Sequence, residues 1–196
     1  MSNLAAASDK TGFVELNEAL AHHRIGKRDE VRAALESPAW TRLQLYLTLG
    51  PRTLEEGKKL RTPVSRYSRK VLNKTWRKAG GYGRRLDELS AEERHEMRKT
   101  LKKLRYEAEF FAAIYKNRAT AKFIKRLKDL QDIFGYMVDV RMAPRIVEIQ
   151  QEAGLGCAAA RAAGYAIGRH EADAAYAWKR AGAAWKDLKQ AGRFWQ

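Results

Sequence analysis

The chain has 196 residues, with 39 lysines and arginines against 23 aspartates and glutamates, which gives a formal net charge of +16. A hydrophobic fraction of 45% excludes wholesale disorder, and the single cysteine, Cys157, excludes a disulfide framework and a cysteine-based zinc cluster. No run of about 18 apolar residues occurs, so we expect a cytoplasmic protein with a polyanionic partner and no membrane span.

The positive charge is concentrated in the middle of the chain. Residues 52–128 carry 24 basic and 9 acidic side chains, a net charge of +15. Residues 1–51 carry 6 of each, and residues 129–196 carry 9 basic and 8 acidic side chains. A charge that is concentrated in this way attracts a partner of opposite sign.

Apolar residues recur at spacings of three and four along the chain, which is typical of helices, and no stretch alternates as a strand would. Residues 1–12 are expected to form a flexible N-terminal segment, followed by one helical domain over 13–196. Six helices with short connections predict an all-α antiparallel bundle. The predicted helices cover residues 13–36, 40–49, 63–79, 90–115, 119–151 and 157–191.

Several boundaries have a specific local signal. Ser37-Pro38 predicts the end of the first helix, and Ser90 with Glu93 three residues later predicts a capping box. The segment Gly80-Gly81-Tyr82-Gly83 is expected to form a flexible turn. The helix over 119–151 is expected to kink or break around Gly135 or before Pro144.

Residues 94–115 carry two stripes at helical spacing. The apolar stripe contains Met97, Leu101, Leu104, Ala108 and Phe111. The second stripe contains His95, Arg98, Lys102 and Arg105, with Lys99 and Tyr106 beside it. Such a row over ten residues is about 15 Å long and suits an extended chain of negative charges, although a solvated basic face is the ordinary alternative.

Two other predicted helices carry basic rows opposite their apolar faces. On 63–79 the row is Arg66, Lys70, Lys74 and Arg77, and on 119–142 it is Lys122, Lys125, Arg126 and Lys128. The apolar stripe of the latter helix is Phe123, Leu127, Leu130, Phe134 and Met137. The three rows line one groove or point to separate sides, and both arrangements stay open at this point.

Residues 95–111, with the sequence HEMRKTLKKLRYEAEFF, resemble the second signature of CHAD domains, the conserved-histidine α-helical domains. Residues 127–135, LKDLQDIFG, resemble the Leu-Lys-x-Leu-Gln-x-x-Leu-Gly element of that family. A weaker resemblance extends over residues 16–20, 63–79, 163–168 and 193–195. The specific part covers about residues 90–140.

This resemblance implies a helical domain of two similar halves around a basic channel, which binds inorganic polyphosphate without catalysis and often stands beside a triphosphatase domain. The channel residues that it implies are His95, Arg98, Lys102 and Arg105, with Lys128 from the next helix and Lys74 and Arg77 from the upstream helix. The neighbouring cations Lys99 and Lys125 complete the predicted polyphosphate-binding set.

The sequence departs from the family pattern at two places. Residues 1–50 contain no counterpart of the first family signature, and His22-His23-Arg24 does not match it, so the chain is expected to be the second half of a CHAD domain or a fragment of a larger protein. The family's Gly-x-x-Asn-Asp reads Gly135-Tyr-Met-Val138-Asp139, in which Val138 replaces the asparagine.

We expect no enzyme, no cofactor and no metal site. The sequence has no GxxxxGK[ST] loop, no HExxH motif and no acidic cluster that would hold Mg²⁺. The expected partner is inorganic polyphosphate or another polyanion, and the protein is expected to associate with polyphosphate granules. The alternatives are a basic helical protein that binds nucleic acid and a half-domain that assembles with a second copy, an N-terminal half or a triphosphatase domain.

Overall fold

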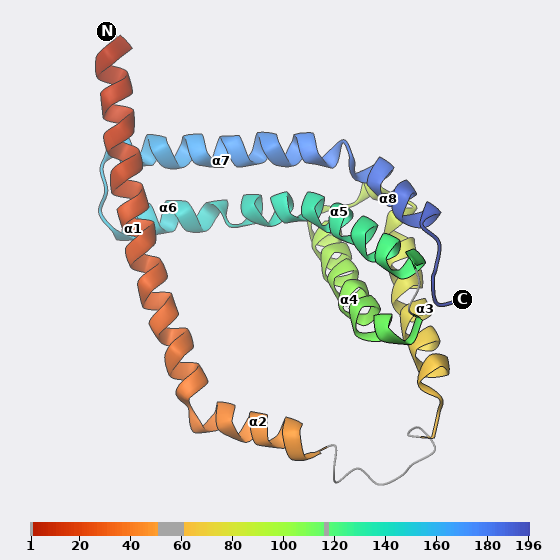
Figure 1. The fold of residues 1–196 in the computed structure, drawn as a ribbon. Coiled ribbons are helices and arrows are strands. Elements are labelled where there is room, and N and C mark those ends of the chain that lie inside the picture. The colour runs from red at the N-terminus through yellow and green to blue at the C-terminus, as the bar shows by residue number, and fades with distance from the viewer. Residues whose placement is uncertain (1, 51–60, 116–117) are drawn as a thin grey trace. The chain divides into compact units, whose positions relative to one another are not determined.

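The computed structural model describes residues 2–50, 61–115 and 118–196, with the side chains of 2–9, 138 and 139 outside that description. Within these ranges the chain forms helices and turns without strands, which confirms the all-α prediction. Figure 1 shows the helices, which are α1 (Ser2–Glu36), α2 (Pro38–Leu49), α3 (Val64–Gly83), the short 3-10 helix η2 (Leu86–Glu88), α4 (Ala91–Tyr115), α5 (Arg118–Arg141), α6 (Ala143–Glu152), α7 (Cys157–Trp178) and α8 (Ala181–Gln190).

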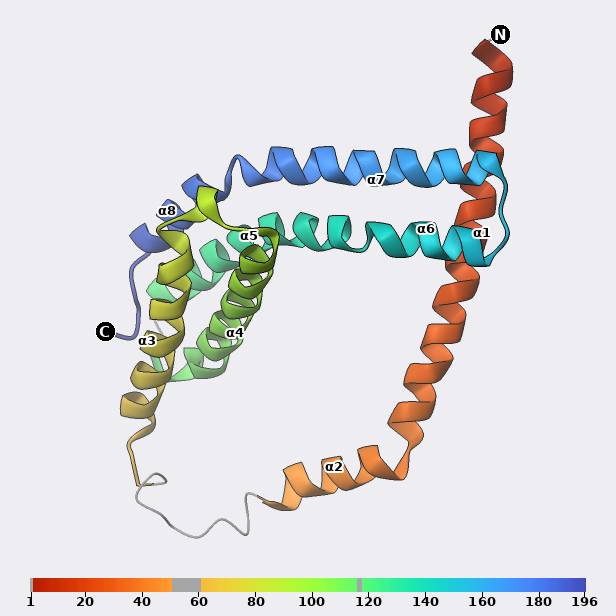
Figure 2. The ribbon, with the colours of Figure 1, turned by 180° about the vertical axis from the view of Figure 1, so that it is seen from behind.

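The chain divides into two compact units. The first consists of Met1–Arg61 and Ala143–Ile167, and the second consists of Thr62–Met142 and Gly168–Gln196. In the second unit α4 packs against both α3 and α5, and α8 packs against α5. The same neighbours lie together in the opposite views of Figures 1 and 2.

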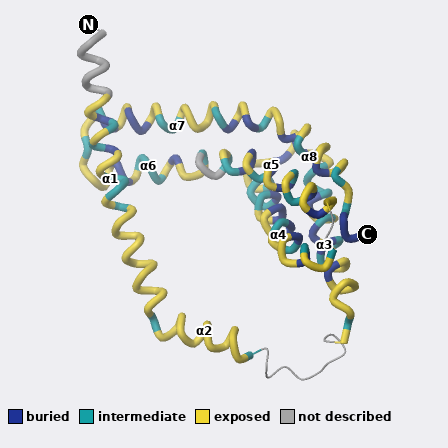
Figure 3. Tube along the Cα trace, in the orientation of Figure 1, coloured by how far each residue is buried: buried dark blue, intermediate teal, exposed yellow. Residues whose placement is uncertain are grey.

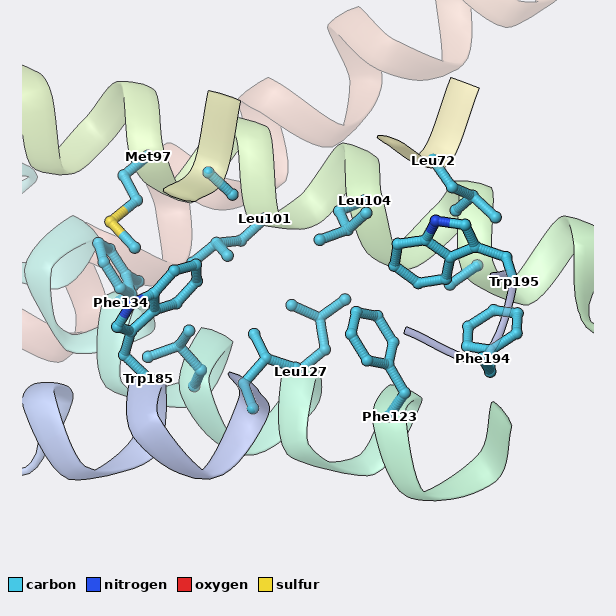
Figure 4. Packing of buried hydrophobic residues seen from close by; sticks show 14 of the residues in the cluster. Leu72, Met97, Leu101, Leu104, Phe123, Leu127, Phe134, Trp185, Phe194 and Trp195 are labelled. Carbon is cyan, nitrogen blue, oxygen red and sulfur yellow. The ribbon is translucent and has the colours of Figure 1, made fainter. Parts of the chain in front are cut away.

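The core of the second unit consists of the two predicted apolar stripes facing each other. Met97, Leu101 and Leu104 of α4 are fully buried, as are Phe123 and Leu127 of α5. Figure 4 shows these side chains in two facing rows, with Phe134 continuing the row of α5. Residues with 3.6-residue periodicity can bury only one face of a helix, so this packing leaves the basic residues of α4 on its other sides.

Aromatic side chains close both ends of this core. Trp76 stacks on Trp185 with ring centroids 5.5 Å apart and contacts Trp195 edge to face. The indole Nε1–H of Trp195 donates to Oδ1 of Asn73 over 3.0 Å, which attaches the C-terminal segment to α3. Trp185 and Trp195 are both buried, so these two tryptophans near the C-terminus are core residues.

The predicted capping box at the start of α4 is confirmed. The amide of Glu93 donates to Oγ of Ser90 over 3.2 Å, and the amide of Ser90 donates to Oε2 of Glu93 over 3.0 Å. Arg85 adds an ion pair to Glu93 at 2.6 Å. These bonds lower the pKa of Glu93, the backbone hydrogen bond from Ser90 contributing most, and keep its carboxylate charged at the helix start.

The prediction of a flexible turn at Gly80–Gly83 is wrong, because α3 continues through Gly83. The physical reason is packing against α8. A Cβ atom at position 83 would overlap the indole ring of Trp185, so only glycine lets the last turn of α3 approach that ring. The glycine serves close approach here and does not break the helix.

Three other boundaries differ from the prediction. α1 begins at Ser2 instead of at about residue 13, so it runs through the segment that was expected to be flexible. The helix over 119–151 breaks before Pro144, as expected, but stays helical at Gly135. The helix over 157–191 is divided into α7 and α8 by residues 179 and 180.

The first unit has a smaller core, in which Leu16 of α1 packs against Ala159, Ala162 and Ala163 of α7. α2 contributes no buried residue to either core. Its large apolar side chains are between 38% (Trp40) and 73% (Tyr46) exposed. Figure 3 shows α2 and the second half of α1 exposed along almost their whole length.

Substituting Gly83 by alanine is expected to destabilise the second unit. Alanine favours a helix over glycine by about 1 kcal/mol, but here the added methyl group must displace the buried ring of Trp185, and overpacking of this kind costs about 1–3 kcal/mol. Gly81→Ala is the matched control, since its Cβ would meet nothing within 4 Å. Chemical denaturation should show Gly83→Ala less stable and Gly81→Ala equally or more stable than wild type. A Gly83→Ala variant that gains stability would contradict the role assigned to this contact.

Candidate anion-binding groove

The basic stripe of α4 lines a groove between α4 and α5. The groove has a volume of about 460 Å³ and contains Arg98, Lys102 and Arg105 of the predicted site. Because the apolar stripe of α4 is buried against its neighbours, its rotation is set and these three side chains lie on the side of α5. The other lining residues are Tyr106 of α4 and Gln131, Asp132, Gly135 and Tyr136 of α5.

Two side chains of this groove hold buried hydrogen-bond donors that have no acceptor among the described residues. They are Nε of Arg105 and Nε2 of Gln131. A buried donor without an acceptor costs about 1–3 kcal/mol, so such groups are rarely left unused. The accessible charges of the groove are those of Arg98, Lys102 and Arg105, and three cations side by side favour an acceptor-rich anion as the ligand.

Two carboxylates lie beside the cations of the groove. Glu109 lies 3.3 Å from Nζ of Lys128 and 4.0 Å from Nε of Arg105, measured to its Oε1. Lys128 is thereby brought near Arg105, although it does not line the groove itself. Asp132 adds a second carboxylate to the lining. The three lining cations and Lys128 still exceed these two acidic groups.

His95 lies in an adjoining pocket of about 570 Å³ instead of in the groove itself. Arg98 lines both hollows, so they share one wall. The adjoining pocket contains Arg94, whose guanidinium carbon lies 4.2 Å above the ring of Trp178. The predicted row from His95 to Arg105 therefore spans two connected sites.

Lys99 and Lys74 lie on another side of α4, toward α3. Lys99 forms an ion pair with Glu96, and Lys74 lies close enough to Glu107 to favour its charged form. The pKa of Glu96 is lowered, mainly by the hydrogen bond from Lys99. The structure does not bring these two lysines into the groove. Lys99 is about 100° around α4 from Arg98, and Lys74 belongs to α3.

Glu107, on this same side, has a raised pKa. Burial of its carboxyl group is the main cause, and a hydrogen bond from Thr75 offsets part of it. Its Oε2 atom has no hydrogen-bond partner in the described ranges. The charged form of Glu107 is therefore a cost to the folded state that its neighbours only partly relieve.

The remaining predicted residues are placed less specifically. Arg77 is exposed on α3, where its Nε donates to the carbonyl oxygen of Asn73 over 3.3 Å. Lys125 is exposed on α5, one turn before Lys128, and does not line the groove. The side chains of Val138 and Asp139 lie outside the described residues. The structure therefore does not test the effect of Val138 in place of the family's asparagine.

The sequence analysis did not single out the α5 side of the groove. Gln131 and Asp132 are polar residues next to the apolar stripe of α5, and Tyr136 follows one turn later. Their position beside Leu130 and Phe134 was a usable signal, since residues flanking a buried stripe border the neighbouring helix. Arg94 was missed because it lies outside the predicted row.

Among the described residues, no group of three or more histidine, cysteine, aspartate or glutamate side chains is arranged to hold a metal ion. Of the helices in the described ranges, none combines the length and the apolar character that crossing a membrane requires.

Comparison with known protein families gives one result. The sequence model of the CHAD domain matches residues 2–148, which is well over half of the chain. The match includes residues 2–50, where no family signature was recognised, and it does not confirm that the chain corresponds to the second half of the domain. No curated protein and no solved structure matches the chain.

Replacing Glu107 by glutamine is expected to stabilise the protein at neutral pH. Glutamine keeps an oxygen that accepts from Thr75 but removes the buried charge. Since the folded-state pKa of Glu107 is raised, the wild type gains stability from protonation at low pH and loses it as the pH rises through that pKa. Glu107→Gln should therefore raise Tm at pH 7 by about 2–4 °C, the shift that 1 kcal/mol produces in a chain of this size, and the gain should fade on acidification.

Glu96→Gln is the matched control for this test. It makes the same substitution on the same helix, but the pKa of Glu96 is lowered, so its charge stabilises the folded state. Thermal melts of both variants between pH 4 and pH 7 should give opposite signs. An equal rise for both variants at pH 7 would show a general effect of net charge and contradict the assignment to Glu107.

Proposed function

The chain belongs to the CHAD domain family, and from that premise we propose that it binds inorganic polyphosphate, without catalysis, in the groove between α4 and α5. The observation that carries this proposal is the lining of the groove, in which the cations Arg98, Lys102 and Arg105 lie together. Association of CHAD domains with polyphosphate supports the same ligand.

The spacing of the groove's cations fits a linear polyanion. Arg98 and Arg105 are seven residues apart, which is about 10 Å along the helix axis. Polyphosphate carries a negative charge on each successive phosphate unit, so it can contact the whole row at once. Charged hydrogen bonds from arginine and lysine to phosphate oxygens are short and strong, and binding releases counter-ions.

Glu109 is proposed to compete with the ligand. In the free protein its carboxylate pairs with Lys128 and lies near Arg105. An incoming phosphate would have to draw both cations away from it. This arrangement keeps two cations close together without a ligand, at a cost in affinity.

Nucleic acid is the competing ligand for the same charges. Its phosphate backbone would contact the row of α4 in the same way. The groove lining also contains the exposed rings of Tyr106 and Tyr136, on which a base could stack, so the lining alone does not separate the two ligands. Competition decides between them, since polyphosphate should displace labelled RNA or DNA more readily than the reverse.

Assembly with another chain is a second proposal, which the exposed apolar face of α2 favours. Isolated helices of about 12 residues are marginal in water, and α2 has no buried residue to support it. We propose that a second copy of this chain covers it, while an N-terminal half or a triphosphatase domain would bury the same face. Together with polyphosphate binding, we also propose that the protein is cytoplasmic and associates with polyphosphate granules.

The groove assignment predicts the effect of substituting Arg98, Lys102 and Arg105 together by glutamine. Affinity for long-chain polyphosphate should fall at least 100-fold, because three charged contacts are lost. The slope of log affinity against log salt concentration should become shallower by about 2, if each lost contact contributes as on single strands. Calorimetric titration at two salt concentrations measures both quantities.

Two comparison variants make this test specific. A triple variant of Lys74, Arg77 and Lys99 to glutamine removes the same charge outside the groove, and it should lose less than 10-fold. Glu109→Gln should bind more tightly than wild type, because it frees Lys128 and Arg105. Equal losses for the two triple variants would show binding by net charge alone and would overturn the groove assignment.

The assembly proposal predicts a molecular mass that depends on concentration. Sedimentation between low and high micromolar protein should show dimers, and Leu43→Glu with Leu47→Glu, four residues apart on one side of α2, should shift the protein toward monomers by adding charge to that exposed face. A strict monomer across this range would contradict assembly with a second copy.

A further inference from the structure

The adjoining pocket of the second unit has walls unlike those of the groove. Its apolar lining comes from Phe134, Met137 and Val140 of α5 and from Trp178 of α7. The volume of about 570 Å³ lies within the range of small-molecule pockets, about 300–1,000 Å³. An unbranched phosphate chain has no group that this apolar wall would bind.

Trp178 gives the pocket an aromatic wall that is held in place. Phe134 contacts its ring edge to face, with centroids 5.4 Å apart, and the guanidinium of Arg94 lies over the ring at 4.2 Å. Nε of Arg94 is a further buried donor without an acceptor in the described part of the chain. The pocket thus joins flat surfaces to an unused donor, a combination that suits a planar heteroaromatic ring.

The rim of the pocket carries charges of both signs. Glu92 pairs with Arg141 over 3.6 Å, and Glu171 lies in the same lining. His95 and Arg98 stand on the side of the groove. Carboxylates can accept from the ring N–H and amino groups of a base, whereas an alkyl chain would cover these charged groups and offer them nothing in return.

The two hollows adjoin each other at Arg98, which lines both. From Arg98 the row continues to Lys102 and Arg105, about 6 and 10 Å further along the helix. A ligand with a flat ring at one end and a short phosphate chain at the other would therefore meet matching groups in order. The ring would meet the aromatic wall, and the phosphates would meet the cations.

We propose that this double site binds nucleoside triphosphates, with the base in the pocket beside Trp178 and the phosphates in the groove from Arg98 toward Arg105. The phosphate half of the site rests on the proposed function, and the base half rests on the pocket alone. Nucleoside triphosphates and polyphosphate then compete for Arg98, Lys102 and Arg105.

The test compares ATP with inorganic tripolyphosphate, which has the same phosphate chain without the nucleoside and carries more negative charge. Calorimetric titration of the full chain, without Mg²⁺ and at fixed ionic strength, should give at least 5-fold tighter binding of ATP. Charge alone predicts the reverse order, so a preference for ATP reports the pocket.

Filling the pocket should remove that preference and leave the groove intact. Ala175→Leu adds a side chain from an exposed position of the lining, and Ala91→Leu does so from α4. Ala172→Leu is the matched control, because Ala172 is exposed on the same helix and does not line the pocket. Each filling variant should bind ATP no more tightly than tripolyphosphate, with tripolyphosphate affinity within 2-fold of wild type.

The possible failures are distinguishable. If wild type binds tripolyphosphate and long polyphosphate but shows no preference for ATP, the base pocket is wrong and the groove stands. The same holds if Ala175→Leu and Ala91→Leu keep the preference. If none of the three ligands binds, the groove assignment fails together with the inference drawn from it.

Discussion

The site depends on the burial of one stripe of α4. Met97, Leu101 and Leu104 are fully buried against α3 and α5, and each such side chain contributes about 1.5–3 kcal/mol when it leaves water. This packing sets the rotation of the helix, because turning it by one residue would move the stripe by 100° and expose it. Once the rotation is set, Arg98, Lys102 and Arg105 must lie beside α5. The groove is thus a consequence of the core.

The same rotation distributes the charges of α4 over two sides with different chemistry. Toward α3, Lys99 and Lys74 lie near Glu96 and Glu107, so those cations already have carboxylates close by. Toward α5, cations exceed carboxylates, and the donors of Arg105 and Gln131 have no acceptor within the described ranges. The second side is therefore the one that we propose for an external anion. In the proposed mode of binding, net charge attracts a polyanion to the molecule, and the cations of the groove between α4 and α5 hold it.

Periodicity predicted the helices, both apolar stripes and the basic row of α4, because burial of one face leaves a regular trace in sequence. Periodicity could not predict the residues of α5 that line the groove, since Gln131 and Asp132 border it only because α5 packs beside α4. It also failed at Gly83, where glycine allows contact with Trp185 from a distant helix. Lys74 was assigned to the site by the family resemblance and Lys99 as a cation beside the basic row, and their carboxylate neighbours became visible only in three dimensions.

The most direct test of the groove is to map amide chemical shifts of the full chain during titration with long-chain polyphosphate. The account predicts that the largest changes fall on residues 94–106 of α4 and 128–136 of α5, with small changes on the face where α4 meets α3. Changes centred on residues 66–78 of α3, or spread evenly over all basic residues, would contradict it.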